Sequence, residues 1–180
     1  MKKRHYIFLL MILSLVSTHS FAQMPIDKGT AFVNAGIGVG TYGLGTFGGY
    51  GFNSGIAIGA SAEFGVYKNI TVGGFADYRR VGYVGVPGGT NYIYLGARGS
   101  YHFNELLKLP MNNLDLYAGL GIGYLVATLD RTYYGGYSAG GVIVPVHIGG
   151  RYFFSDNVGG FAELATDVAP LKLGVTFKLK

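Results

Sequence analysis

The chain has 180 residues, of which 49% are hydrophobic, 15% aromatic and 13% charged, with 32 glycines and no cysteine. The low charge and high aromatic content exclude an intrinsically disordered chain, and the absence of a three-residue glycine period excludes a collagen-like one. Without cysteine the protein has no disulfide framework, no cysteine-ligated zinc and no thiol catalysis, and its length suits a single domain.

The first 22 residues predict a secretory signal peptide. Lys2, Lys3 and Arg4 precede an apolar run at residues 7–16, and Ala22 is a small residue before the expected cleavage site. The run is too short to cross a bilayer as a helix. Cleavage removes three of the 14 basic residues and leaves 11 against nine acidic ones, so the formal net charge falls from +5 to +2. No basic stripe remains, so we expect no nucleic-acid binding.

Eight segments of the remaining chain alternate between apolar and small or polar residues, as half-buried strands do. They cover residues 30–41, 55–66, 70–79, 91–103, 114–128, 142–154, 158–165 and 171–180. One set is aliphatic and nearly uncharged, whereas the other consists of glycine, small residues and charges. A soluble β-sandwich shows the inverse distribution. Residues 23–180 therefore predict an all-β domain, an eight-stranded antiparallel up-and-down transmembrane β-barrel with lipid outside and a polar lumen.

The connections and the aromatic residues fit this topology. Short links at 67–69 and 155–157 alternate with long links at 42–54, 80–90 and 130–141, as periplasmic turns and outer loops do. Link 104–113 is long for a periplasmic turn, and link 166–170 is short for an outer loop. The outward aromatic residues fall near the two predicted interfaces. They are Tyr101, Phe103, Tyr152, Phe154 and Phe177 toward the periplasm, with Tyr78 and Tyr124 toward the other side.

Residues 149–164 (GGRYFFSDNVGGFAEL) and 171–180 (LKLGVTFKLK) resemble the last strands of the small eight-stranded outer-membrane β-barrel proteins, which include the OmpX-like and OmpA-transmembrane-like barrels. The resemblance implies a location in the bacterial outer membrane and insertion by the outer-membrane assembly machinery. In that family the machinery reads a terminal strand that usually ends in an aromatic residue, and here Phe177 lies three residues before the end. Family members have diverse functions, so the resemblance implies a fold and not a role.

Strand parity places ten ionisable side chains in the lumen. They are Glu63, Asp77, Arg79, Arg98, His102, Asp115, His147, Arg151, Glu163 and Lys172. Four are acidic and four are permanently basic, and we expect them to pair into a network that fills a narrow barrel. A narrow channel for small solutes or ions is the alternative, because lumen glycines could leave a gap. A soluble periplasmic barrel that binds an apolar ligand is a second alternative, and it requires the aliphatic set to face inward.

No catalytic, cofactor-binding or metal-binding residue is assigned. His102 and His147 are expected to be hydrogen-bonded lumen residues, because a metal site needs several convergent ligands. The GxGxxG pattern at 38–43 lacks the helix that nucleotide binding requires, and Ser54 and Ser155 lack a neighbouring histidine for esterase chemistry.

The sequence thus predicts a non-enzymatic, monomeric barrel with a structural or surface-interaction role and outer-membrane lipid as its partner. Its tyrosine- and glycine-rich loops form either a rigid rim or a recognition surface for another molecule. These loops hold Phe47, Tyr50, Phe52, Tyr133, Tyr134 and Tyr137.

Overall fold

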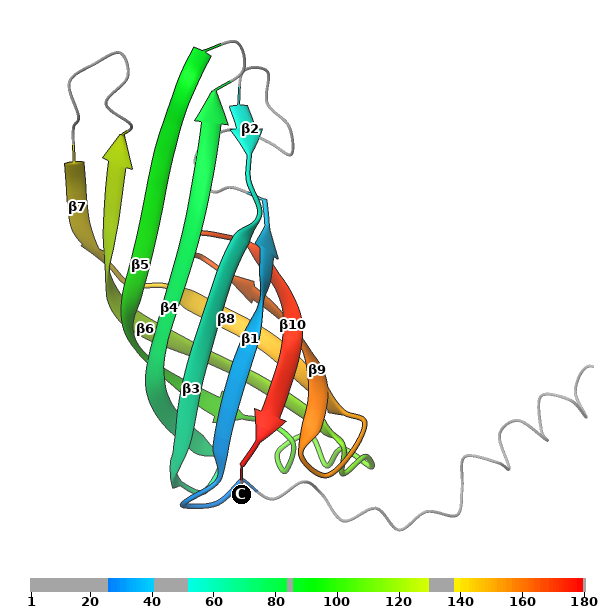
Figure 1. The fold of residues 1–180 in the computed structure, drawn as a ribbon. Coiled ribbons are helices and arrows are strands. Elements are labelled where there is room, and N and C mark those ends of the chain that lie inside the picture. Colours follow the sequence, from blue (N-terminus) through cyan, green and yellow to red (C-terminus); the bar gives the residue numbers. More distant parts are fainter. Residues whose placement is uncertain (1–25, 41–51, 84–85, 130–137, 180) are drawn as a thin grey trace, which may run out of the picture.

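The computed structural model describes residues 26–40, 52–83, 86–129 and 138–179. In this part of the chain no helix is long and apolar enough to cross a membrane. The ten strands of Figure 1 are β1 (Ala31–Val39), β2 (Phe52–Ser54), β3 (Ala57–Tyr67), β4 (Ile70–Tyr83), β5 (Val86–His102), β6 (Leu114–Leu129), β7 (Ser138–Ile143), β8 (Val146–Phe153), β9 (Val158–Ala165) and β10 (Leu171–Lys178). The predicted signal peptide and the loop residues Phe47, Tyr50, Tyr133, Tyr134 and Tyr137 lie outside the described residues.

Eight of these strands close an antiparallel barrel. β1 pairs with β3 on one side and with β10 on the other, and the ring continues through β9, β8, β6, β5 and β4 back to β3. The closing register runs without a shift from Phe32 opposite Lys178 to Val39 opposite Leu171. Closure removes the free sheet edge, whose unpaired backbone groups would each cost several kcal/mol in hydrocarbon. The predicted eight-stranded antiparallel barrel is therefore confirmed.

The short strands β2 and β7 prolong two strands of the ring toward one end of the barrel. β2 pairs with β4 beyond the end of β3, and residues 55–56 separate β2 from β3. β7 pairs with β6 beyond the end of β8, and Pro145 lies in the break between them. Proline has no amide hydrogen to give to the ladder, although its carbonyl accepts a hydrogen bond from Gly121 N at 2.8 Å.

The strands on one side of the barrel are longer than the sequence predicted. Segment 80–90, expected to be a long loop, continues the β4–β5 hairpin to Tyr83 and Val86, and residues 138–141 belong to β7. In Figure 1, β2, β4, β5, β6 and β7 rise above the remaining strands at the end that we call the loop end. The opposite end carries the connections at 68–69, 103–113 and 154–157 and is called the turn end.

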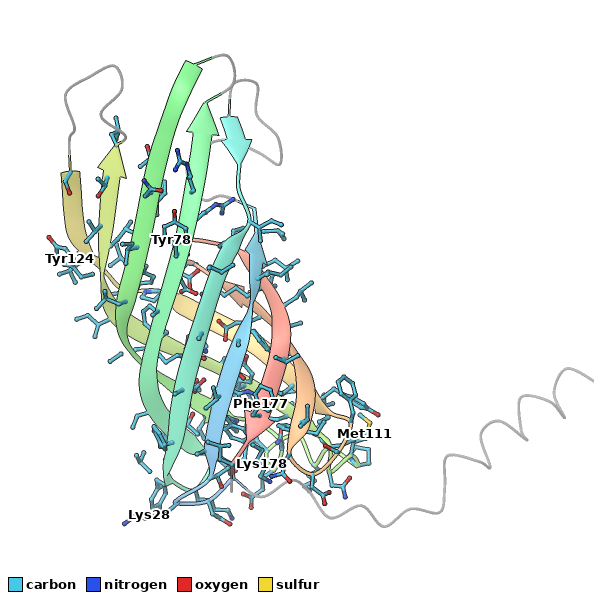
Figure 2. All side chains as sticks on the ribbon, in the orientation of Figure 1. Lys28, Tyr78, Met111, Tyr124, Phe177 and Lys178 are labelled. Carbon is cyan, nitrogen blue, oxygen red and sulfur yellow. The ribbon has the colours of Figure 1, made fainter. Side chains whose placement is uncertain are left out.

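The aliphatic set faces outward, as the alternation predicts. Ile58, Leu95 and Val144 are 56%, 53% and 63% exposed although they lie within strands or beside a strand end. This orientation contradicts the second alternative, a soluble barrel with an apolar lumen. In Figure 2, Tyr78 and Tyr124 lie toward the loop end and Phe177 lies near the turn end, so outward aromatic residues flank the aliphatic belt at both ends.

Candidate functional site

The ten ionisable side chains selected by parity lie on the inner side of the barrel wall. Nine are buried and Lys172 is half-buried. They come from seven of the eight ring strands, because alternate residues of each strand point to the axis. The interior is therefore the part of the molecule where polar chemistry is concentrated, and its geometry decides what the barrel can do.

Arg151 of β8 is fully buried in this interior and is hydrogen-bonded along its whole guanidinium group. Its Nη1 lies 2.8 Å from Asp115 Oδ2, and its Nη2 lies 2.9 Å from Glu63 Oε1. Its Nε donates to Asn34 Oδ1 at 3.2 Å. These three partners lie on β6, β3 and β1, so a single side chain ties together strands from different sides of the barrel.

Two aromatic rings lie against the same guanidinium group. Its Cζ lies 4.6 Å from the ring centroid of Phe32 and 4.1 Å from that of Tyr117. Cations attract the faces of such rings most strongly where water is excluded. Arg151 is thus held by carboxylates and lies against two aromatic rings.

A second ion pair crosses the lumen beside the first. Arg98 of β5 binds Glu163 of β9 through two hydrogen bonds, with Nη1–Oε1 at 3.2 Å and Nη2–Oε2 at 2.6 Å. The Tyr117 hydroxyl also donates to Glu163, at 3.0 Å. Arg98 Nε lies 3.4 Å from Glu63, so the two ion pairs form one connected cluster. Bidentate arginine–carboxylate contacts of this kind are among the stronger hydrogen bonds in proteins.

Both lumen histidines are hydrogen-bonded within the cluster. His102 Nδ1 lies 2.7 Å from Asp115 Oδ1, and its Nε2 lies 3.1 Å from the Thr71 hydroxyl. His147 Nε2 lies 2.9 Å from the Ser100 hydroxyl. Among the described residues, no group of three or more histidine, aspartate or glutamate side chains is placed to hold a metal ion.

A separate ion-pair group lies toward the loop end. Lys172 of β10 contacts Asp77 of β4 and Asp167 of the β9–β10 connection, each at 2.7 Å. Arg79 donates to the Val168 carbonyl at 2.7 Å. The connection 166–170, expected to be a short outer loop, instead folds inward, and Ala169 is fully buried. Asp167 therefore adds an interior carboxylate that parity did not select.

The interior also contains large rings, which corrects the expectation of glycine, small residues and charges. The inward aromatic residues are Phe32, Phe75, Tyr94, Tyr117, Phe153 and Phe161. Several rings lie against the glycines of neighbouring strands. A Cβ atom at Gly123 would lie 2.6 Å from Tyr94 Cε2 and 3.0 Å from Phe75 Cζ, and one at Gly174 would lie 2.7 Å from Phe161 Cε1. The rings thus occupy the space beside these glycines.

The turn end of the lumen is closed by apolar side chains. Ile26, Phe32 and Phe153 form a buried cluster there, and the Ile26 carbonyl accepts a hydrogen bond from Asn69 N at 2.8 Å. Farther up, one interior cavity of about 20 Å³ is bordered by Asp77 and Lys172. Another, of about 10 Å³, is bordered by His147 among others. Each has room for about one water molecule.

Sequence reasoning missed the neutral partners of the charged side chains. Ser100 and Thr71 both donate to Glu63 Oε2, at 2.6 and 2.8 Å, and Asn34 binds Arg151. Thr71 and Ser100 have the same parity as the charged residues on their strands, and Asn34 has the parity of the inward glycines of β1, so the signal was present. Asp167 gave no such signal because it lies outside the alternating segments.

Comparisons with known proteins give the same fold. No protein-family model matches the sequence, and no curated protein matches it. Among solved structures, the N-terminal β-barrel domain of Pseudomonas aeruginosa OprF has a TM-score of 0.54 at 16% identity, covering 84% of this chain and 98% of that one. The outer membrane protein OprG of the same organism has a TM-score of 0.56 at 12% identity, covering 88% and 99%. Neisserial surface protein A has a TM-score of 0.51 at 16% identity, covering 83% and 96%.

These similarities and the geometry define the class of the protein. Its fold is that of the small eight-stranded outer-membrane β-barrels. An aliphatic belt around a closed barrel, flanked by aromatic residues at both ends, is the surface that such proteins present to lipid. The chain is therefore a transmembrane β-barrel of the bacterial outer-membrane type.

Proposed function

We propose that this protein is a non-conducting, non-enzymatic barrel of the bacterial outer membrane, a monomeric anchor that holds its loop-end strands at the cell surface. The observation that carries the proposal is the connected cluster around Arg151 and Arg98, which spans the lumen between β1, β3, β5, β6, β8 and β9. The partners that this role requires are outer-membrane lipid and, during biogenesis, the assembly machinery.

The cluster supports a blocked lumen because an ion could pass only by displacing it. Breaking a buried ion pair costs about 3–5 kcal/mol, since it leaves an uncompensated charge. The cavities of about 20 and 10 Å³ beside the cluster have room for single waters rather than a hydrated ion. Below the cluster, Ile26 and Phe153 narrow the lumen further with apolar atoms.

The same geometry supports the absence of catalysis. Ser100 and His147 lie 2.9 Å apart, but the Ser100 hydroxyl also donates to Glu63 at 2.6 Å. A nucleophilic serine needs a base that takes its proton and an open position for substrate beside it. Ser100 is 3% exposed and His147 is 4% exposed, so neither offers that position.

The test is the conductance of the purified, refolded barrel in planar lipid bilayers. We expect no reproducible unit conductance. The double variant Arg98→Ser/Glu163→Ser, which removes both members of one lumen pair, is expected to produce conductance steps. The matched control Lys68→Ser/Glu105→Ser removes an exposed ion pair at the turn end and should remain silent. Reproducible steps from the unmodified protein would contradict the proposal and favour the narrow-channel alternative.

The role of the loop end follows from the strand lengths. β5 has 17 residues and β6 has 16, whereas β8, β9 and β10 have eight each. The longer strands form a wall on one side of the barrel that rises beyond the ends of β8, β9 and β10 (Figure 1). Such a wall is suited to carrying the adjoining loops away from the lipid surface, where they would contact other molecules.

A further inference from the structure

The connection between β5 and β6 differs from the other turns of its end in length and composition. Residues 103–113 separate the two strands, and three of their apolar side chains are exposed: Leu106 at 65%, Leu107 at 55% and Met111 at 39%. The neighbouring connections end the hairpins with polar residues, Lys68 and Asn69 in one and residues 155–157 in the other. Residues 106–111 thus hold three exposed apolar side chains, whereas the 154–157 connection holds one, Phe154 at 73%.

This turn is fixed to the barrel by its own polar side chains. Asn104 is buried and donates to Asp115 Oδ1 at 3.2 Å. Glu105 accepts hydrogen bonds from Lys68 Nζ at 2.7 Å and from Asn69 Nδ2 at 2.8 Å. The polar residues at the start of the turn therefore face the protein, and the leucines that follow are left to the surroundings.

The backbone of the turn is compact. Leu107 N donates to the Phe103 carbonyl at 2.8 Å, and Leu109 N donates to the Asn104 carbonyl at 3.1 Å. Lys108 has a φ of 49°, a left-handed conformation that ends this coil. The exposed apolar side chains are consequently held at defined positions instead of being carried on an extended loop.

The aromatic residues next to the turn connect it to the lipid-facing belt. Tyr101 and Phe103, which lead into the turn, have ring centroids 5.1 Å apart. Leu114, which follows the turn, is paired with Tyr152, whose ring lies 5.9 Å from that of Phe154. Tyr101, Tyr152 and Phe154 are 39%, 48% and 73% exposed, as expected for side chains that meet lipid. Figure 2 shows Met111 at the same end of the barrel as Phe177 and Lys178.

We propose that residues 106–111 form an interfacial anchor, with Leu106, Leu107 and Met111 inserted at the boundary between the headgroups and acyl chains of the leaflet at the turn end. Apolar side chains next to a cation favour this position, because the chains leave water while the cation stays near lipid phosphates. Lys108 is the exposed cation of this turn. The inference rests on the proposed membrane location and adds a specific lipid contact to it. A fixed anchor at one side of the rim would also set the depth and tilt of the barrel.

The test uses single tryptophans, because the sequence contains none. Leu107→Trp reports on the turn, Leu120→Trp reports on the belt, where Leu120 is 63% exposed, and Asp156→Trp reports on the polar β8–β9 turn. Each variant is reconstituted in phosphatidylcholine vesicles whose acyl chains are unmodified, brominated near the headgroup or brominated near the chain end. Fluorescence quenching is then compared with quenching by aqueous iodide added on both sides of the membrane.

We expect brominated lipid to quench Leu107→Trp at least about twofold more than Asp156→Trp, with the reverse order for iodide. Equal behaviour of these two variants would overturn the anchor, and the leucines would then be a surface for a periplasmic protein. Because Asp156→Trp carries the same ring at the same end, it corrects for the affinity of tryptophan itself for interfaces. Failure of both brominated lipids to quench Leu120→Trp would instead overturn the membrane location, so the two failures are distinguishable.

Discussion

Replacing Arg151 by methionine tests whether the lumen cluster holds the barrel together. The substitution keeps a long side chain beside the rings of Phe32 and Tyr117 and removes the charge. It breaks the contacts of 2.9 Å to Glu63 and 2.8 Å to Asp115. Each carboxylate retains another partner, because Glu63 lies 3.4 Å from Arg98 Nε and Asp115 contacts His102. The cost should therefore be that of one buried pair, about 3–5 kcal/mol, and not twice that amount.

Equilibrium urea unfolding of the barrel in lipid vesicles, followed by circular dichroism, measures this cost as the change in the free energy of unfolding. Glu63→Gln is the partner variant, and the double variant Glu63→Gln/Arg151→Met completes the cycle. We expect the double variant to cost clearly less than the sum of the two single variants, because no unpaired charge remains between these positions. Strict additivity, or a cost of Arg151→Met below about 1 kcal/mol as for an exposed pair, would refute a structural role for the cluster.

Three further predictions concern the belt, the lumen glycines and the turn end. Leu120→Arg, on the lipid-facing surface, should destabilise the barrel by about 2–4 kcal/mol in the same unfolding assay, and an unchanged stability would contradict a lipid contact there. Gly123→Ala should cost about 1–3 kcal/mol because its Cβ would lie 2.6 Å from a lumen ring. Outward-facing Gly74→Ala should change stability by less than about 0.5 kcal/mol, since its Cβ would meet nothing closer than 3.4 Å, and the opposite order would show the inner and outer faces to be reversed. The hydrogen bond from Lys68, with that from the adjacent asparagine, lowers the pKa of Glu105 below its ordinary value of 4.5. The contact of Glu105 with Lys68 and Asn69, which attaches the 103–113 turn to the β3–β4 turn, is therefore complete above pH 4.5. It is lost as the pH falls through the lowered pKa of Glu105. Amide hydrogen exchange of residues 104–109, corrected for its intrinsic pH dependence, should accelerate in that range, and Glu105→Gln should remove the pH effect.

The architecture was predictable because a period of two dominates the sequence. In β3, Ile58 and Phe64 have one parity while Glu63 has the other, and the structure exposes the first two and buries the third. Lipid on one side and a closed lumen on the other impose this contrast on every strand of the ring. The alternation therefore predicted both the number of ring strands and which side chains of each strand face the lipid or the lumen.

The loop-end strands were less predictable. Residues 80–90 and 138–141 are rich in glycine, and glycine disfavours strands when judged residue by residue. The strand geometry of residues 80–83, 86–90 and 138–141 comes from the pairing of β4 with β5 and of β6 with β7, which extends past the aliphatic belt. Pairing between strands determines the secondary structure of these residues, and local composition does not predict that pairing.

The lumen contents were predicted by charge but not by shape. Parity selects Arg151 and Glu63, yet it says nothing about which carboxylate meets which base, because that depends on barrel size and strand stagger. Parity places Phe161 on the inner face, and Phe75 has the same inward parity, but parity does not show which space an aromatic ring fills. The two rings pack against glycines of neighbouring strands. An aromatic residue of inward parity opposite cross-strand glycines was therefore the available signal for a ring in the lumen.

The most direct test of the account is which side chains touch acyl chains. The barrel is placed in nanodiscs that contain a lipid with a nitroxide near the end of its acyl chain, and methyl resonances are recorded by NMR. The account predicts strong broadening for Ile58, Leu95 and Val144 and none for Thr71 and Thr176, which are fully buried inside the barrel. Broadening of the threonine methyls with sharp Ile58, Leu95 and Val144 signals would contradict it.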